Sequence, residues 1–153
     1  MRVLTVLFAI VALGSSGLAL ENKGKGLHLK DLPVAVQKTV EANLNGGEIK
    51  SIVKEKEDGV EQHEIETLRN GKARNVDVDS KGTLLVIEEE TTIDAIPAAA
   101  KVGILKKVAD GKLGVIETLS KPGQPMMYEA SYTDKMGKKH EMLVKADGTK
   151  KKD

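Results

Sequence analysis

The feature that most constrains the fold is an internal repeat, in which the sequence returns to a similar pattern after 64 residues. Leu32-Pro33 recurs as Ile96-Pro97, and apolar residues follow each proline at every fourth position. Matched glycines follow each apolar stripe, and after two inserted residues the offset becomes 66. A long spacing that occurs twice predicts a duplicated unit and argues against a solenoid of many short repeats.

Each copy is predicted to begin as a helix and to continue as an antiparallel sheet. Proline is favoured in the first turn of a helix, and Val36, Val40 and Leu44 form one apolar stripe at helical spacing. Alternating segments separated by Asn-Gly and Asp-Gly turns are typical of hairpin-connected strands. In the first copy the predicted strands cover residues 48–56, 60–68, 72–79 and 83–88.

These patterns predict an α+β fold of two tandem units, each with one helix on a three- to four-stranded antiparallel sheet, preceded by a signal-peptide helix. One unit of about 60 residues buries little core alone, so the units either pack together or share an extended sheet. The last strand of the second copy is missing or very short, which predicts an open edge. The predicted boundaries are 1–19 for the signal peptide, 20–30 for a flexible leader, 31–90 for the first unit and 91–153 for the second with its charged tail.

The first 19 residues have the organisation of a cleaved secretory signal. Arg2 precedes an apolar run over residues 3–13, and Gly17 and Ala19 fit the small-residue positions of a cleavage site. The alternative is a transmembrane anchor, but the run is shorter than the roughly 20 residues that span a bilayer. We therefore expect a periplasmic or secreted protein without a stable membrane anchor. Because the sequence has no cysteine, disulfides, lipoprotein anchoring and thiol catalysis are excluded.

The charges balance overall but divide between the two halves of the chain. Residues 30–90 carry 9 basic and 14 acidic side chains, whereas residues 91–153 carry 12 basic and 8 acidic ones. Opposite signs favour end-to-end attraction within or between molecules. Only Tyr128 and Tyr132 remain as aromatic residues once Phe8 leaves with the signal. A small basic surplus without aromatic stacking platforms argues against nucleic acid as a partner.

The segment from Asp77 to Gly82, with Glu88 at the twelfth position, imitates a calcium-binding loop. Such loops place oxygen ligands at alternate positions and end on a bidentate glutamate, so Asp77, Asp79 and Glu88 are candidate metal ligands. Lys81 stands where the fifth-position ligand belongs, and the flanking segments alternate like strands. The alternative interpretation is a hairpin turn with solvent-facing aspartates, and we expect no cofactor.

A second candidate site consists of Met126, Met127, Tyr128 and Tyr132, which brings the mature chain's aromatic residues together beside two methionines. Methionine adapts to irregular surfaces, and tyrosine combines apolar contact with a hydroxyl, so these residues are candidates for partner contact. The alternative is that they fill the core of the second unit, since strand alternation places Tyr128 and Tyr132 on one face.

Catalytic motifs find no support in the sequence. It contains no Gly-x-Ser-x-Gly elbow, no glycine-rich phosphate loop after a strand and no histidine pair at metal-ligand spacing. The Glu88-Glu89-Glu90 run is interpreted as a solvated strand end or linker. We therefore expect a protein that is not an enzyme.

The glycine turns and alternating strands of the first copy lie in the segment IKSIVKEKEDGVEQHEIETLRNGKARNVDVDSKGTLL, behind a Leu-Pro helix start and a Gly-Gly stop. This pattern resembles the PepSY-like family, which is also called beta-lactamase-inhibitor-like. The resemblance covers Asp31 to Glu90 well and Ile96 to Gly148 less closely. It implies a periplasmic or secreted two-copy α+β protein. PepSY domains occur in metallopeptidase propeptides, where an inhibitory or chaperoning role is proposed.

Beta-lactamase inhibitory protein is a similar tandem, but it has disulfides and an aromatic-rich contact face, which this chain lacks. The resemblance is therefore not extended to a beta-lactamase target. We expect an exported, non-enzymatic binding or inhibitory module that contacts a protein through its sheet face or open edge. The alternative is a periplasmic small-ligand or calcium-binding protein that uses the Asp77 to Glu88 segment.

Overall fold

The computed structural model describes residues 26–57 and 59–151. The predicted signal peptide lies outside the described residues, and so does the first part of the predicted leader. The last residues of that leader enter a single 3-10 turn, Leu29–Asp31. No helix in the described part of the chain is long and apolar enough to cross a membrane.

Two helices and seven strands follow this turn within the described residues. Each helix begins directly after a proline, Pro33 or Pro97, as the repeat predicts. The elements are α1 (Val34–Asn43), β1 (Glu48–Glu57), β2 (Val60–Arg69), β3 (Lys72–Asp79), β4 (Leu84–Thr91), α2 (Ala98–Val108), β5 (Lys112–Ser120), β6 (Met127–Thr133) and β7 (Lys139–Lys145).

All seven strands form one antiparallel sheet whose spatial order is the order of the chain. The junction is the pairing of β4 with β5, in which Ile87–Thr91 pair with Ile116–Ser120. The prediction of two tandem units, each with a helix on its own three- to four-stranded sheet, is therefore wrong. The physical reason is that β4 would otherwise be an edge with unpaired backbone groups, which β5 satisfies. A shared extended sheet, the other possibility, is what the pairing shows.

Both helices lie on the same face of this sheet. Directly paired residues of neighbouring strands point to the same side of a sheet. Val76 pairs with Ile87, and Thr91 pairs with Ile116. Because Ile87 and Thr91 are an even number of positions apart on β4, all four side chains lie on the same face. Val76 belongs to the hydrophobic cluster under α1, and Ile116 belongs to the cluster under α2. The opposite side of the sheet has no helix on it within the described chain, and we call it the open face.

The core consists of two hydrophobic clusters, one under each helix. The cluster under α1 is purely aliphatic, and its buried members are Leu32, Val36, Val40, Ile52, Ile65, Val76 and Val78. The cluster under α2 includes both tyrosines, and its buried members are Ile96, Ala100, Ile104, Val108, Ile116, Tyr128, Ala130, Tyr132, Met142 and Val144.

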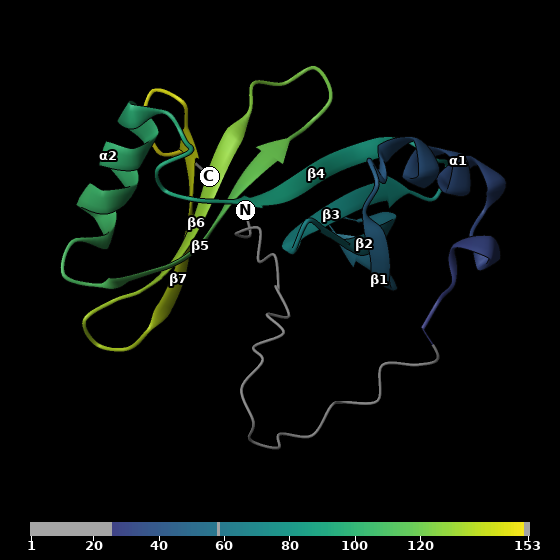
Figure 1. Ribbon diagram of the computed structural model, residues 1–153, viewed down its shortest axis with the longest axis horizontal. Coiled ribbons are helices and arrows are strands. Elements are labelled where there is room, and N and C mark those ends of the chain that lie inside the picture. The colour runs from purple at the N-terminus through teal and green to yellow at the C-terminus, as the bar shows by residue number, and fades with distance from the viewer. Residues whose placement is uncertain (1–25, 58, 152–153) are drawn as a thin grey trace.

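The sheet bends between the two clusters. In Figure 1, α2 and α1 lie at opposite ends of the view with the strands between them, although both helices pack on the same face of the sheet. The helices therefore lie on the outside of the bend, and the open face lies on its inside. Strong twist and bending are expected of a seven-stranded antiparallel sheet.

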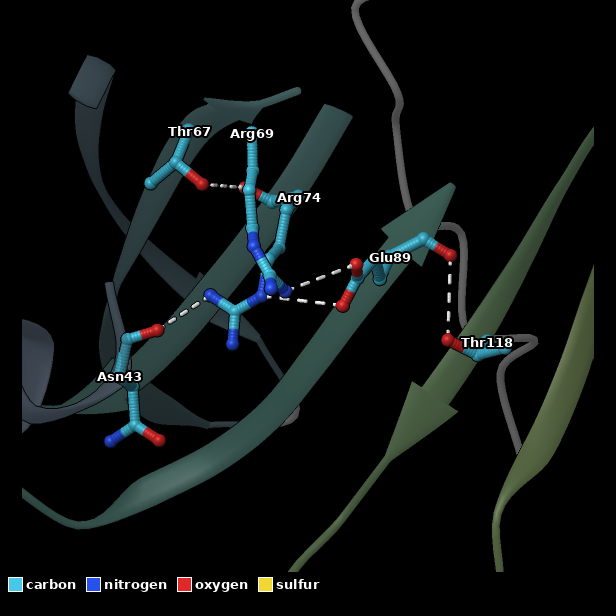
Figure 2. Close-up of polar contacts among 6 residues, drawn as sticks. All are labelled: Asn43, Thr67, Arg69, Arg74, Glu89 and Thr118. Atoms are coloured by element: carbon cyan, nitrogen blue, oxygen red, sulfur yellow. Dashed lines mark hydrogen bonds and ion pairs between the residues drawn. The ribbon is translucent and has the colours of Figure 1, made fainter. Parts of the chain in front are cut away.

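A buried arginine connects α1 to the strands near the junction (Figure 2). Arg74 is 5% exposed, and its Nη1 donates a hydrogen bond to the carbonyl of Asn43 at 2.6 Å. Its Nε lies 3.5 Å from the carboxylate of Glu89, which Arg69 also approaches at 3.6 Å. Thr118 of β5 donates to the backbone carbonyl of Glu89 at 3.4 Å. A cation at the carboxyl end of a helix is favourable, so this cluster holds α1, β3 and β4 together.

Glycine turns support the first turn of each helix. Gly82 and Gly148 have φ values of +90° and +83°, which favour glycine. A Cβ atom on Gly82 would lie 2.7 Å from the carbonyl carbon of Ala35, and one on Gly148 would overlap the carbonyl oxygen of Ala99. The helix starts therefore rest on turns that have no room for a side chain.

We predict that Gly148→Ala lowers the free energy of unfolding by about 1–3 kcal/mol more than Gly137→Ala does. Gly137 has a φ of +82°, but nothing lies within 4 Å of the place that a Cβ atom would take there, so both variants share the left-handed strain and only one meets α2. Urea denaturation of both variants measures the difference. Equal losses would show that α2 does not rest on this turn.

We also predict that Arg74→Ala destabilises the protein by about 2 kcal/mol, because it removes a charged hydrogen bond between a buried guanidinium and a half-buried carbonyl. Arg69→Ala is the matched control, since Arg69 approaches the same carboxylate from a more exposed position and should cost about 0–1 kcal/mol. Thermal unfolding of the two variants tests the ranking, and a larger loss for Arg69→Ala would contradict it.

Candidate functional site

The open face collects acidic side chains from every strand of the sheet. Strand alternation sends every second residue to this face, and the pairing registers identify which residues these are. The acidic residues on it include Glu48 and Glu55 on β1, Glu64 and Glu66 on β2, Asp77 on β3, Glu88 and Glu90 on β4, Glu117 on β5, Glu129 on β6, and Glu141 on β7.

Three of these glutamates lie directly opposite one another on consecutive strands. Glu90 pairs with Glu117 across the β4–β5 junction, and Glu117 pairs with Glu129 on β6. Neighbouring strands are about 4.8 Å apart, and like charges directly opposite one another destabilise a sheet. We call Glu88, Glu90, Glu117 and Glu129 the glutamate row, because Glu88 lies beside the three on the same face.

Two members of the glutamate row are buried and the other two, Glu90 and Glu129, are half-buried, although no described helix covers them. Glu88 is 5% exposed and Glu117 is 7% exposed, as expected on the inside of a bent sheet. Burial, with repulsion from Asp77 and then Glu117, raises the pKa of Glu88 to about 9. Burial, and then the neighbouring Glu129, raises the pKa of Glu117 to about 7. The pKa of Glu129 is likewise raised by burial to about 7, so at neutral pH Glu88 holds a proton and Glu117 and Glu129 are each partly protonated.

Apolar side chains lie among the carboxylates. Leu119 pairs with both Glu88 and Met127, and Leu143 pairs with Glu129, so these apolar residues share the open face. Leu119 is buried, whereas Met127 and Leu143 are half-buried. The centre of the open face is therefore partly apolar and partly acidic.

Basic residues lie at the ends of the strands on this face. Lys112 pairs with Thr133, Thr133 pairs with Lys139, and Lys145 pairs with Met127. None of these three cations is the direct partner of a glutamate of the row. The row is therefore not neutralised by cross-strand pairing.

The residues proposed from sequence for partner contact do not form one patch. Tyr128 and Tyr132 are each 8% exposed and lie in the cluster under α2, where Tyr132 stacks on His140 with ring centroids 5.0 Å apart. Met127 points to the open face, and Met126 is exposed just before β6. The alternative, that the tyrosines fill the core, is confirmed.

The residues proposed as metal ligands have separate roles. Asp77 and Glu88 lie on the open face, whereas Asp79 closes the β3–β4 turn. The Asp79 carboxylate accepts backbone hydrogen bonds from Lys81 at 2.9 Å and Thr83 at 2.8 Å, which lower its pKa. In the described ranges, no three His, Cys, Asp or Glu side chains are arranged to hold a metal ion.

The same turn chemistry occurs twice more. Asp134 accepts a backbone hydrogen bond from Met136 at 2.8 Å, and Asp147 accepts one from Thr149 at 2.9 Å. An aspartate that caps its own turn explains the apparent calcium motif by local hydrogen bonding.

Sequence reasoning missed Glu117 and Glu129 and misread the Glu88-Glu89-Glu90 run. The run is part of β4, with Glu88 and Glu90 on the open face and Glu89 on the helix face near Arg74. The alternating positions of the carboxylates were visible in the sequence, but the registers that align them were not. Only the β4–β5 pairing brings Glu90 opposite Glu117.

The outer edges of the sheet are less available than the open face. β1 is rich in lysine and glutamate, and charged edges resist further strand pairing. Beside β7, Lys150 forms a bridge with Val144, and the Lys151 N–H donates to the Leu143 carbonyl at 2.9 Å. The edge predicted to be open is therefore partly paired by the C-terminal segment.

Comparison with known proteins identifies the fold. No family model matches the sequence, and no curated protein matches it significantly. Several solved structures share the fold, and among them is a BLIP-like protein from Bacteroides fragilis with a TM-score of 0.60 and 18% identity. That match covers 79% of this chain and 84% of the other.

Two further Bacteroides structures are similar. One, from Bacteroides eggerthii, is described as a predicted periplasmic protein, and it has a TM-score of 0.67 and 15% identity to this chain. The match covers 79% of this chain and 86% of that structure's chain. The other, a DUF2874 family protein from Bacteroides ovatus, has a TM-score of 0.63 and 14% identity, with coverages of 79% and 85%. The chain therefore has a BLIP-like fold, which confirms the inhibitor-like part of the resemblance. Its PepSY-like part stays a prediction.

We predict that the protein loses stability as the pH rises from about 7 to about 9. The folded state holds a proton on Glu88 up to a pKa of about 9, whereas the ordinary pKa of a glutamate in an unfolded chain is 4.5, so raising the pH favours unfolding. The stabilisation is complete below the unfolded pKa and is lost as the pH passes the folded one. Burial lowers the pKa of His63, which acts in the opposite direction but only below about its ordinary value of 6.5.

Glu88→Gln imitates the protonated carboxyl and should reduce this loss, giving a higher Tm than the wild type at about pH 9. Glu41→Gln removes one carboxylate from an exposed position on α1 and should leave the pH profile as in the wild type. Melting temperatures across the pH range test this, and a wild-type Tm that rises with pH would contradict it.

Proposed function

We propose that this protein is an exported, non-enzymatic binding module that contacts another protein through the open face. The observation that carries the proposal is the alignment of Glu90, Glu117 and Glu129 on a face that no described helix covers. Directly opposed carboxylates reduce the stability of the sheet. Proteins retain such local conflicts mainly where function requires them.

The pattern of pKa values supports binding over acid–base catalysis. Catalytic carboxyl pairs have environments that drive their pKa values apart, so that one is an acid and the other is ionised. Here the pKa values of Glu88, Glu117, Glu129 and Glu141 are all raised, with burial as the main cause. These four carboxyls are shifted in the same direction, which supports one acidic surface over an acid with a partner base.

The BLIP-like fold supports protein contact by analogy alone, and the similarity to a predicted periplasmic protein supports export alongside the signal-like N-terminus. Membership of the PepSY-like family is part of the same proposal. The open face is favoured over the sheet edges because β1 is charged and β7 is partly paired.

The test is affinity capture of partners from a bacterial envelope extract with three forms of the mature chain. The wild type should retain one stoichiometric protein, and Glu90→Lys/Glu129→Lys, which reverses two charges on the open face, should reduce its recovery at least about tenfold, equivalent to about 1.4 kcal/mol. Glu41→Lys/Asp110→Lys makes the same change in net charge at exposed positions outside the open face and should retain the partner. Equal recovery by all three forms would refute the proposal.

A further inference from the structure

We infer that the open face takes a partner polypeptide segment that presents lysine or arginine side chains, and that this binding expels protons from the glutamate row. The inference rests on the proposed function of the open face and specifies the chemistry of its partner. It is carried by the charge of the face and by the apolar residues among its carboxylates, both of which follow from the strand registers.

Charge complementarity identifies the partner as basic. Glu90, Glu117 and Glu129 are aligned without a lysine or arginine as a cross-strand partner. Lys121 is the basic residue that acts on Glu129, and Lys139 and Lys145 lie at the ends of β7. Cations brought by a partner would relieve the repulsion that the chain itself leaves in place.

A second copy of the same surface does not fit this face. Placing one open face against another would bring two acidic rows together, and like-charge juxtaposition across an interface is strongly unfavourable. The partner that binds the open face must therefore carry positive charge.

The apolar residues among the carboxylates indicate long basic side chains in place of small cations. Leu119, Met127 and Leu143 share the open face with Glu88 and Glu129. Lysine and arginine bury their aliphatic stems on apolar surface while the charged group reaches a polar one. A hydrated metal ion makes no use of such apolar neighbours.

Proton release follows from the state of the row before binding. Buried carboxyls with raised pKa values hold protons at neutral pH, and a cation placed beside them favours the ionised form. The ionisable groups that act on members of the row from outside it are Glu64, Asp77, Glu141 and Lys121, and the members also act on one another. Among these, Lys121 is the cation, so a partner's cations would change the balance. A neutral partner would instead favour the protonated form, and binding would take up protons.

The experiment is isothermal titration calorimetry of the mature chain with acetylated tetralysine amide, in phosphate and in Tris at about pH 7. These buffers differ in ionisation enthalpy, so the difference between the measured heats reports the protons released. We expect saturable binding, net proton release, and an affinity that rises up to about tenfold per pH unit for each proton released.

Two variants give the matched comparison. Glu117→Gln cannot release a proton and should weaken tetralysine binding and reduce proton release, whereas Glu41→Gln on α1 should behave as the wild type. Thermal unfolding confirms that both variants are folded. Binding that is unchanged in Glu117→Gln would overturn the inference, because the peptide would then lie elsewhere.

Two further results separate this inference from the proposed function. If the captured envelope protein depends on the open face but binds more tightly as the pH falls, the binding module stands and the basic partner is refuted. If capture does not depend on the open face, the proposed function itself fails. Spermine matches the charge of tetralysine, so equal affinity and equal proton release with spermine would overturn the assignment to a polypeptide.

Discussion

The pairing of β4 with β5 is the interaction on which the rest of the structure depends. Five residue pairs join the halves into one sheet, and their register places both helices on the same side. The opposite side is then continuous across all seven strands. Without this ladder, β4 and β5 would be exposed edges, and Glu90 would not lie opposite Glu117.

Opposite charges are paired on the helix face of the sheet, whereas like charges lie opposite one another on the open face. On the helix face, Glu89 is approached by Arg69 and Arg74, and Arg74 also donates to the end of α1. These charges are paired inside the molecule and contribute to its stability. On the open face, Glu90 and Glu117 face each other, and burial makes their repulsion stronger than it would be in water. Opposite charges on one face thus support the fold, whereas like charges on the other are available for recognition.

The scarcity of aromatic residues has a consequence for recognition. Both tyrosines of the described chain are committed to the core under α2, where Tyr132 stacks on His140. Interface hot spots are usually aromatic residues or arginine, so the open face does not have the residue types of an aromatic binding surface. Charge complementarity mainly increases association rates and specificity, and both depend on salt and pH.

Local structure is largely determined by the sequence itself. Pro33 and Pro97 mark where the helices begin, the glycine turns separate the strands, and alternation places Tyr128 and Tyr132 on one side of β6. These features depend on residues close together in the chain, where backbone preferences and side-chain spacing act directly. The sequence pattern predicts that β4 ends near residue 88, but the strand continues to Thr91 because its last residues pair with β5.

Only the tertiary structure decided how the halves are joined and which carboxylates meet. A strand's sequence specifies its own two faces but not the neighbour or register with which it pairs. The calcium-like motif illustrates this limit of local sequence patterns. Asp79 accepts hydrogen bonds within its own turn, whereas Glu88 lies beside Glu117, which is 29 residues away in the chain. Such contacts come from long-range backbone pairing, which local sequence patterns do not encode.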